Sequence, residues 1–483
     1  MNRTPDDMTP AEVDSYVDNY AQGNVKEVFW CVNARKAAFD SSVIEPTWAG
    51  YGETDEEIME ALACVGDKKR EAIFNKIRCA RKLSRNGIDV FERWLHISRQ
   101  KGLGARLSIR MNDAHFTYLD EGAVHSTLWL KKPELRRTDY LRESQNWRTF
   151  DYAQEEIQNY FLAFIDEVLG RYDLDTLELD WMRHNLHFRP GFEEEGIDIS
   201  SCFMEKAHEL VIKHQKKRDH KIELAVRVPT HYEACLGLGL DPILWARKQY
   251  VDRISLTPLF QSCDSDIPIR VWKTLLSGSD VMLAGCLEAN LMPYPGAERY
   301  PNALASVLGQ AASLAHKGAD KLYLFNFFPE YPKHSMIQKD PTEFPHILNL
   351  TGTDEPITEP RRHIVTYADT VAYGEKHYSV LPLHLDKKII GKIRIHVGTV
   401  EPNANARVIL GFKNASECDD LEWVRVNGRI SKEVADAKPL APGPTEHLLT
   451  LSVEQSALHD GYNVIEVSSK KCATITWAEM SFS

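Results

Sequence analysis

The sequence lacks long apolar segments. No stretch of the 483 residues approaches the roughly 20 consecutive apolar residues of a membrane span, and residues 1–10 are polar. We therefore expect no membrane partner and no signal peptide. The nine cysteines are an odd number without CxxC spacing, and most lie in apolar runs, which is typical of free thiols in a reducing compartment. These features favour a cytoplasmic protein, although a chain trimmed from an exported precursor would have the same composition.

A surplus of basic residues is also absent. The chain has 58 Lys+Arg against 70 Asp+Glu, a formal net charge of −12, so a nucleic-acid partner is not expected. With 43% hydrophobic and 27% charged residues, the composition is that of a globular protein, and the length predicts two domains or one large barrel with an appendage. Neutral or cationic substrates fit this charge better than polyanions, unless a local basic pocket overrides it.

Several catalytic motifs are missing. There is no GxSxG, no HxH and no HExxH, and no glycine-rich loop follows the first predicted strand, which continues directly into Asn33-Ala34-Arg35. A catalytic serine, a zinc-protease site and a nucleotide-binding doubly wound sheet are therefore disfavoured. We expect no cofactor and no metal.

Short β-rich runs alternate with amphipathic helical patterns from about residue 25 to 330, as in βα units with a parallel sheet. The predicted strands are 27–33, 105–111, 175–181, 222–228, 253–258, 280–287 and 321–327. The predicted helices are 70–85, 87–101, 153–170, 201–218, 240–250 and 300–317.

Seven strands and one weaker candidate at 42–48 predict a (β/α)8 TIM barrel, an α/β fold. After residue 330 the pattern alternates apolar and polar residues with a period of two, with turn signals at Asn427-Gly428 and Asp460-Gly461, which predicts an antiparallel β-sandwich. The predicted sandwich strands are 378–385, 391–399, 406–412, 421–427 and 463–468. The predicted domains are a catalytic barrel over 1–345, a linker over 346–375 and a β-sandwich domain over 376–483.

Active sites of such barrels lie at the carboxyl ends of the strands. There the sequence places a set of polar side chains that we expect to bind substrate, and two that we expect to be catalytic. The expected substrate-binding residues are Asn33, Arg110, Asn112, Asp113, Glu178, Arg183, His184, Arg227, His231 and Asn326. The expected catalytic residues are Asp180 and Glu288.

Asp180 and Glu288 predict glycoside hydrolysis, in which one carboxyl group protonates the leaving oxygen and a second carboxylate attacks the anomeric carbon or activates water. Asp180 is the expected acid and Glu288 the nucleophile or base. Glu178 lies on the same face as Asp180 and has a supporting role, paired with Arg110 or Arg227. Those two arginines either neutralise the carboxylates or bind an acidic sugar, since arginine binds carboxylates through two hydrogen bonds.

Two alternatives stay open. The first is a carbohydrate-binding barrel protein without catalysis. The second is a metal-dependent lyase or isomerase of a small sugar acid, in which Asp180 and Glu288 bind a divalent ion with His115, His184 or His231.

The segments SIRMND at 108–113, DYA at 151–153 and RYDLDTLELDWMRH at 171–184 resemble a bacterial group of family-10-like, hypothetical glycoside hydrolases. AVRVP at 225–229, DIPIRVW at 266–272, YPGAE at 294–298, GADKLYLFNFF at 318–328 and PRRHIVTY at 360–367 extend this resemblance over most of residues 10–330 and into the following segment. The resemblance implies a TIM barrel, glycosidic hydrolysis and a carbohydrate substrate.

The resemblance to clan A glycoside hydrolases is more distant. It implies an acid/base glutamate after strand four and a nucleophile glutamate after strand seven, a position that Glu288 matches. Strand four departs from that pattern, because Glu178-Leu179-Asp180-Trp181 contains no Asn-Glu pair. DTLELDWM at 175–182 is similar to the strand-four signature of family 18 chitinases, but their catalytic glutamate falls on Met182.

Overall fold

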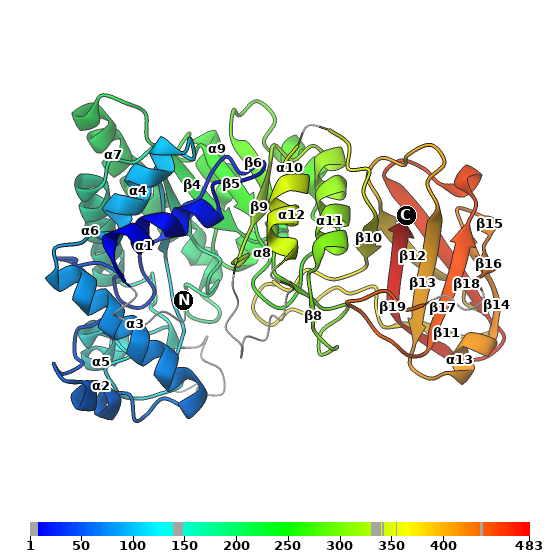
Figure 1. Cartoon of the computed structure of the whole chain (residues 1–483), viewed down its shortest axis with the longest axis horizontal. Helices are drawn as coiled ribbons and strands as arrows, with labels where there is room; N and C mark the ends of the chain where they lie inside the picture. The colour runs from blue at the N-terminus through cyan, green and yellow to red at the C-terminus, as the bar shows by residue number, and fades with distance from the viewer. Residues whose placement is uncertain (1–7, 139–147, 330–339, 341, 354, 435–437) are drawn as a thin grey trace. The chain divides into compact units, whose positions relative to one another are not determined.

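The computed structural model describes residues 8–138, 148–329, 340, 342–353, 355–434 and 438–483 (Figure 1). Residues 1–7 of the polar N-terminal segment lie outside these ranges. Two compact units divide the chain: unit 1 is Met1–Ser255 with Leu276–Met282, and unit 2 is Leu256–Leu275 with Leu283–Ser483. None of the helices in the described ranges is long and apolar enough to cross a membrane.

A seven-stranded sheet with the order β1-β2-β3-β4-β5-β6-β9 confirms the predicted α/β architecture. The pairings β1–β2, β2–β3, β3–β4 and β6–β9 are parallel. Its central strands are buried along almost their whole length, as expected where both faces of a parallel sheet are covered. The strands are β1 (Phe29–Cys31), β2 (Arg106–Arg110), β3 (Thr176–Asp180), β4 (Glu223–Val228), β5 (Arg253–Leu256), β6 (Met282–Leu287) and β9 (Lys321–Leu324).

The predicted strand at 42–48 is wrong. This segment forms only an isolated bridge between Pro46 and Ala37, and β1 pairs directly with β2, Phe29 opposite Arg106. Proline has no N–H to donate to a ladder, which limits pairing at this point. Among the described residues no pairing joins β9 to β1, so the sheet is a curled parallel sheet of the TIM-barrel kind with seven strands rather than the expected eight.

The predicted helices are present, and their ends follow local signals. Asp89 accepts hydrogen bonds from the N–H groups of Phe91 and Glu92, and Asp241 caps a helix whose first residue is Pro242. The helices of unit 1 are α1 (Pro10–Ser15), α2 (Asp55–Ala61), α3 (Asp67–Arg85), α4 (Val90–Gln100), α5 (Thr127–Lys131), α6 (Glu155–Arg171), α7 (Glu193–Arg218), α8 (Tyr232–Gly237) and α9 (Pro242–Arg247). Those of unit 2 are α10 (Ile269–Leu275), α11 (Leu304–Lys317), α12 (Glu343–Leu350) and α13 (Ser416–Asp419).

The C-terminal part of unit 2 is an antiparallel β-sandwich, as predicted, with strands drawn in yellow to red in Figure 1. One sheet has the order β10-β19-β13-β17-β16, with β11 also on β19, and the other has the order β12-β18-β14-β15. The alternating apolar residues of both sheets form one core, which includes Ile393, Val408, Val467 and Ile475.

The sandwich contains strands that the sequence analysis missed, above all the long β19 (Ala473–Phe482), which pairs with β10, β11 and β13. The predicted domain boundaries at 345 and 375 stay predictions. The sandwich strands are β10 (Arg361–Ile364), β11 (Leu383–Leu385), β12 (Gly391–His396), β13 (Ala406–Phe412), β14 (Leu421–Val426), β15 (Arg429–Ile430), β16 (Lys432–Glu433), β17 (Leu448–Val453), β18 (Tyr462–Ser469) and β19; the short β7 (Asn290–Leu291) and β8 (Tyr300–Pro301) form a separate ribbon.

Candidate active site

Asp180, the last residue of β3, is held by three donors. Its Oδ2 accepts a hydrogen bond from Nη1 of Arg227 at 2.6 Å, and its Oδ1 accepts from the backbone N–H groups of Met182 and Arg183 at 2.9 and 3.0 Å. Asp180 and Arg227 are only 2% and 1% exposed. Both carboxylate oxygens of Asp180 are therefore engaged as hydrogen-bond acceptors.

The register of the sheet explains this pairing. Asp180 lies opposite Arg227 on β4 and opposite Arg110 on β2, so the two predicted arginines flank it in one row across three strands. Arg227 therefore pairs with Asp180, and Arg110 pairs with Asp113 at 2.8 Å. Glu178, which we expected to pair with one of these arginines, accepts a hydrogen bond from the Ser108 hydroxyl at 2.8 Å.

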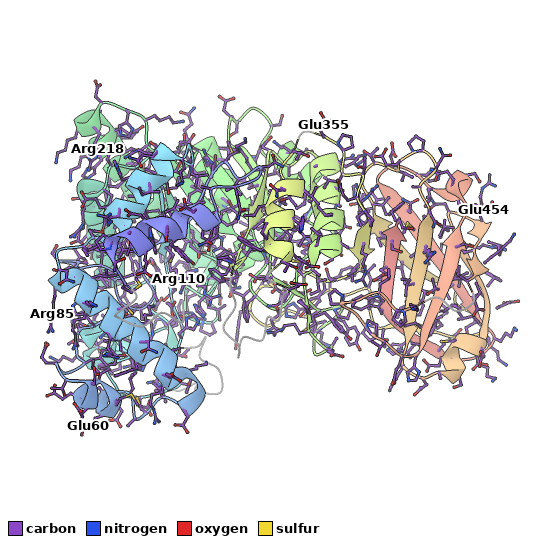
Figure 2. All side chains as sticks on the ribbon, in the orientation of Figure 1. Glu60, Arg85, Arg110, Arg218, Glu355 and Glu454 are labelled. Carbon is purple, nitrogen blue, oxygen red and sulfur yellow. The ribbon has the colours of Figure 1, made fainter. Side chains whose placement is uncertain are left out.

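A second polar cluster follows β2 and β3, and Arg110, one of its members, is labelled in Figure 2. Asp113 accepts from Nη1 of Arg110 and, at 2.7 Å, from Nδ1 of His115. Nη2 of Arg183 donates to Nε2 of His115 at 3.1 Å, and the rings of His115 and His184 meet edge to face at 4.9 Å. The structure thus brings together four predicted residues and adds His115.

Burial sets the protonation of this cluster. It lowers the pKa of His115, and it holds the pKa of His184 well below its usual range. Burial alone would raise the pKa of Asp113, but its contacts with His115 and Arg110 hold that pKa well below its usual range. The cluster therefore contains one carboxylate, two neutral imidazoles and two guanidinium groups at neutral pH.

Asp113, His115 and His184 each offer one ligand atom, and these atoms lie within 4.8 Å of one another, so their types and spacing would suit a divalent ion. However, Nδ1 of His115 is engaged with Asp113 and its Nε2 accepts from Arg183. A cation would have to displace a guanidinium group, and two guanidinium groups would repel it. The arrangement fits an orienting Asp–His pair better than a metal centre.

Asn33 and Asn112 hold the chain at the ends of β1 and β2. Asn33 Nδ2 donates to the carbonyls of Ala34 and Arg110, and its Oδ1 accepts from the N–H of Arg110. Asn112 forms the same kind of bonds with the backbone of Phe150 and Leu186. Since these bonds use both polar atoms of each amide, the geometry favours a structural role over the predicted contact with substrate.

In unit 2, Glu288 directly follows β6 and is fully buried. Nδ2 of Asn326 lies 3.2 and 3.3 Å from its two oxygens, and the N–H of Ala289 donates to Oε1 at 2.9 Å. Asn326 has a φ of 58°, a left-handed conformation that asparagine tolerates better than most residues. The structure therefore brings together the predicted pair Glu288 and Asn326.

His231, the remaining predicted residue, is half-buried and precedes α8, where its backbone carbonyl accepts from Sγ of Cys235. The sequence analysis missed Arg35 and His125, which form a hydrogen bond of 3.0 Å between Nη1 and Nδ1. Both residues lie outside the strands, so no periodic pattern identifies them. The only signal in the sequence is the position of Arg35 directly after the first strand.

Buried neutral histidines predict acid sensitivity. His187 is 1% exposed, and burial lowers its pKa to about 3. Below about pH 6.5 the unfolded chain binds a proton at His187 that the folded chain does not bind. The free energy of unfolding therefore decreases as the pH falls from about 6.5 toward 3. At pH 5.0 the loss from this histidine is about 2 kcal/mol.

Urea unfolding at pH 7.5 and 5.0 measures this effect. In His187→Gln the difference in unfolding free energy between the two pH values should be smaller than in the wild type by about 2 kcal/mol. His96→Gln, at an exposed position of α4, is the matched control. An unchanged pH dependence in His187→Gln would contradict the assignment.

Neither a protein-family model nor a curated protein matches the chain. Solved structures with similar folds include α-L-fucosidase isoenzyme 2 from Paenibacillus thiaminolyticus, at 12% identity and a TM-score of 0.41 over 72% of this chain and 46% of that one. The chain thus spans less than half the length of that fucosidase.

Two further structures are similar at the same low level. Isoenzyme 1 of the same organism is 13% identical, with a TM-score of 0.35 over 97% of this chain and 88% of that one. A family GH18 chitinase from Chromobacterium violaceum is 8% identical, with a TM-score of 0.32 over 80% of each chain. At these values the similarities identify no family.

Proposed function

We propose that the chain is a glycoside hydrolase on a (β/α)8-type barrel, acting on a carbohydrate substrate with Asp180 and Glu288 as its carboxylates. The observation that carries the proposal is the set of ionisable and hydrogen-bonding side chains that follow the carboxyl ends of the parallel strands. Asp180 ends β3 and Arg183 follows it, Arg110 ends β2 and Asp113 follows it, and Glu288 follows β6. Barrel enzymes place their catalytic groups at these ends.

We propose roles that differ from those expected from the sequence. Asp180 accepts hydrogen bonds from a guanidinium and two backbone amides, and we assign it the role of the carboxylate that attacks the anomeric carbon or activates water. The proton donor is then Glu288, the other carboxyl group of the proposal. Retention or inversion follows from the distance between the two groups during the reaction. A cytoplasmic location stays a prediction.

A substrate panel tests the function. The full chain is incubated with aryl glycosides, oligosaccharides and glycosides of sugar acids, and release of the aglycone or the reducing sugar is measured with and without EDTA. Turnover that is insensitive to EDTA is the expected result. Turnover that disappears with EDTA and returns with a divalent ion would favour the metal-dependent lyase or isomerase instead, although the occupied nitrogens of His115 argue against it.

One observation favours the second candidate, a carbohydrate-binding protein without catalysis. Asp180 and Glu288 are 2% and 0% exposed, and both have their oxygens hydrogen-bonded. A group that reacts with a glycosidic bond has to be reached by the substrate. Binding of a sugar by calorimetry without turnover of any panel member would support this candidate and exclude the hydrolase.

A further inference from the structure

A small pocket in unit 1 lies beside the cluster of Arg110 and Asp113. Its polar lining includes Arg35, His125, Ser126 and Asp113, and its apolar lining includes Trp129 and Phe150. The cavity is about 20 Å³, which holds one group of about the size of a water molecule but no sugar ring. A ligand therefore places a small substituent here and leaves its ring outside.

Arg35 is the cation of this pocket. Among the described residues it forms one hydrogen bond, to His125, and no ion pair, and its guanidinium lies 5.1 Å from the centre of the Phe116 ring. Burial lowers its pKa, and the negative charge of Asp113 opposes this effect. A guanidinium has five N–H donors, so four of them have no acceptor among the residues that the structure describes. A half-buried arginine with unused donors is a ready partner for an anion.

His125 fixes the direction of Arg35. Its Nε2 donates to the carbonyl of Leu119 at 3.1 Å, so its Nδ1 accepts from Arg35. Its ring stacks on Trp129 with 4.0 Å between centroids, and burial, together with the charge of Arg35, lowers its pKa to about 3. The imidazole therefore stays neutral near pH 7 and positions Arg35 without adding a charge.

The other polar groups of the pocket complement an anion. The hydroxyl of Ser126 accepts from the N–H of Trp129, and among the described residues this is the only hydrogen bond of that hydroxyl, so its hydrogen is available to a ligand. Asp113 would repel an anion, but the guanidinium of Arg110 already neutralises its charge, and His115 donates a hydrogen bond to it. The amides of Asn33 and Asn112 are engaged with the backbone. Arg35 and Ser126 thus keep donors for the ligand, and Thr149 and Tyr160 also line the pocket.

We infer that this pocket binds the carboxylate of an acidic sugar and that Arg35 is the residue that recognises it. The inference rests on the proposed function, because it names the substrate class of that enzyme. A carboxylate is planar and matches the planar fork of a guanidinium through two parallel hydrogen bonds. One of its oxygens is about the size of the water molecule that the cavity can hold. The arginine pair expected from the sequence is not this site, since Arg227 is engaged with Asp180 and Arg110 with Asp113.

The test compares matched substrates that differ only in charge. Aryl glycosides and oligosaccharides of uronic acids are assayed beside their methyl esters, the corresponding neutral sugars and sulfated sugars. The wild-type chain should have a kcat/KM for the free acid about 100-fold above that for the methyl ester, as expected for a charge-assisted bidentate contact. In Arg35→Ala this ratio should fall to about 1, and in Arg35→Lys it should be intermediate.

Arg270→Ala, at an exposed position of α10, is the matched control and should keep the wild-type ratio. Circular dichroism checks the fold, and Arg35→Gln serves as a second variant if Arg35→Ala does not fold. Preference for the neutral sugar, or an unchanged ratio in the folded variants, would overturn the inference. Preference for a sulfated sugar that is lost in Arg35→Ala would show that the pocket binds a sulfate. That result would overturn the assignment of a carboxylate.

Failure of the proposed function is distinguishable from failure of the inference. If the wild-type chain hydrolyses nothing, the hydrolase is excluded, and calorimetric titration with the same acid and ester pairs still tests the pocket. Binding of the free acid that is lost in Arg35→Ala would support the inference without any turnover. Equal binding of acid and ester, or no binding of either, would overturn it.

Discussion

Replacing Glu288 with glutamine is expected to lower the turnover of an oligosaccharide substrate by at least about 10³-fold, because a positioned proton donor contributes about 10²–10⁴-fold and glutamine cannot give up a proton. The backbone of Glu288 is bonded to Cys263 and Asn302, and these contacts do not depend on its charge, so the fold should be kept. The measurement is kcat for one oligosaccharide and for the 2,4-dinitrophenyl glycoside of the same sugar.

The dinitrophenyl glycoside shows which role Glu288 has. A good leaving group needs no protonation, so its departure should be nearly as fast in Glu288→Gln as in the wild type if Glu288 is the acid. Equal losses with both substrates would assign Glu288 as the nucleophile or base, as expected from the sequence. Glu355→Gln, an exposed position labelled in Figure 2, is the control. Full activity of Glu288→Gln on the oligosaccharide would remove Glu288 from the site.

The parallel sheet could be predicted because short β-rich runs alternate along the chain with amphipathic helical patterns. All seven of these strands are present, at 27–33 as β1 and at 175–181 as β3, for example. The absence of a strand at 42–48 could not be predicted in the same way. Its apolar residues Val43 and Ile44 favour a strand, but whether a segment joins a sheet depends on neighbours that lie far away in the sequence.

The positions of the charged residues could be predicted, but not their partners. Alternation along β3 places Glu178 and Asp180 on one face, and this follows from the sequence alone. Which arginine meets which carboxylate depends on the register between strands, and a shift by two residues would have placed Arg227 opposite Glu178. The observed register, Asp180 opposite both Arg110 and Arg227, is a property of the folded sheet.

The pocket of Arg35 could not be predicted for a different reason. Arg35, His125 and Trp129 come from two segments separated by about 90 residues, and neither segment has strand periodicity. Loops take their conformation from the elements that they connect and from hydrogen bonds such as that between His125 and Leu119. Neither segment alone therefore specifies these contacts.

Replacing Arg227 with methionine is expected to lower the free energy of unfolding by about 3–5 kcal/mol, because it leaves the carboxylate of Asp180 buried without its counterion. The two side chains are 1% and 3% exposed and are joined at 2.6 Å. Asp180→Asn with Arg227→Met should recover part of this loss, since no charge then stays buried, and the asparagine oxygen still accepts from the N–H groups of Met182 and Arg183.

Urea unfolding of the wild type, the two single variants and the double variant gives the coupling free energy, which should be about 2 kcal/mol or more. Arg99→Met is the control, because its partners Asp173 and Asp175 are exposed and an exposed ion pair contributes about 1 kcal/mol or less. Additive losses would show that Asp180 and Arg227 do not stabilise each other. Turnover of the folded Asp180→Asn variant then separates a structural from a catalytic role of this carboxylate. Loss of stability with full turnover would make Asp180 structural. Loss of turnover in variant protein that is still folded would make it catalytic.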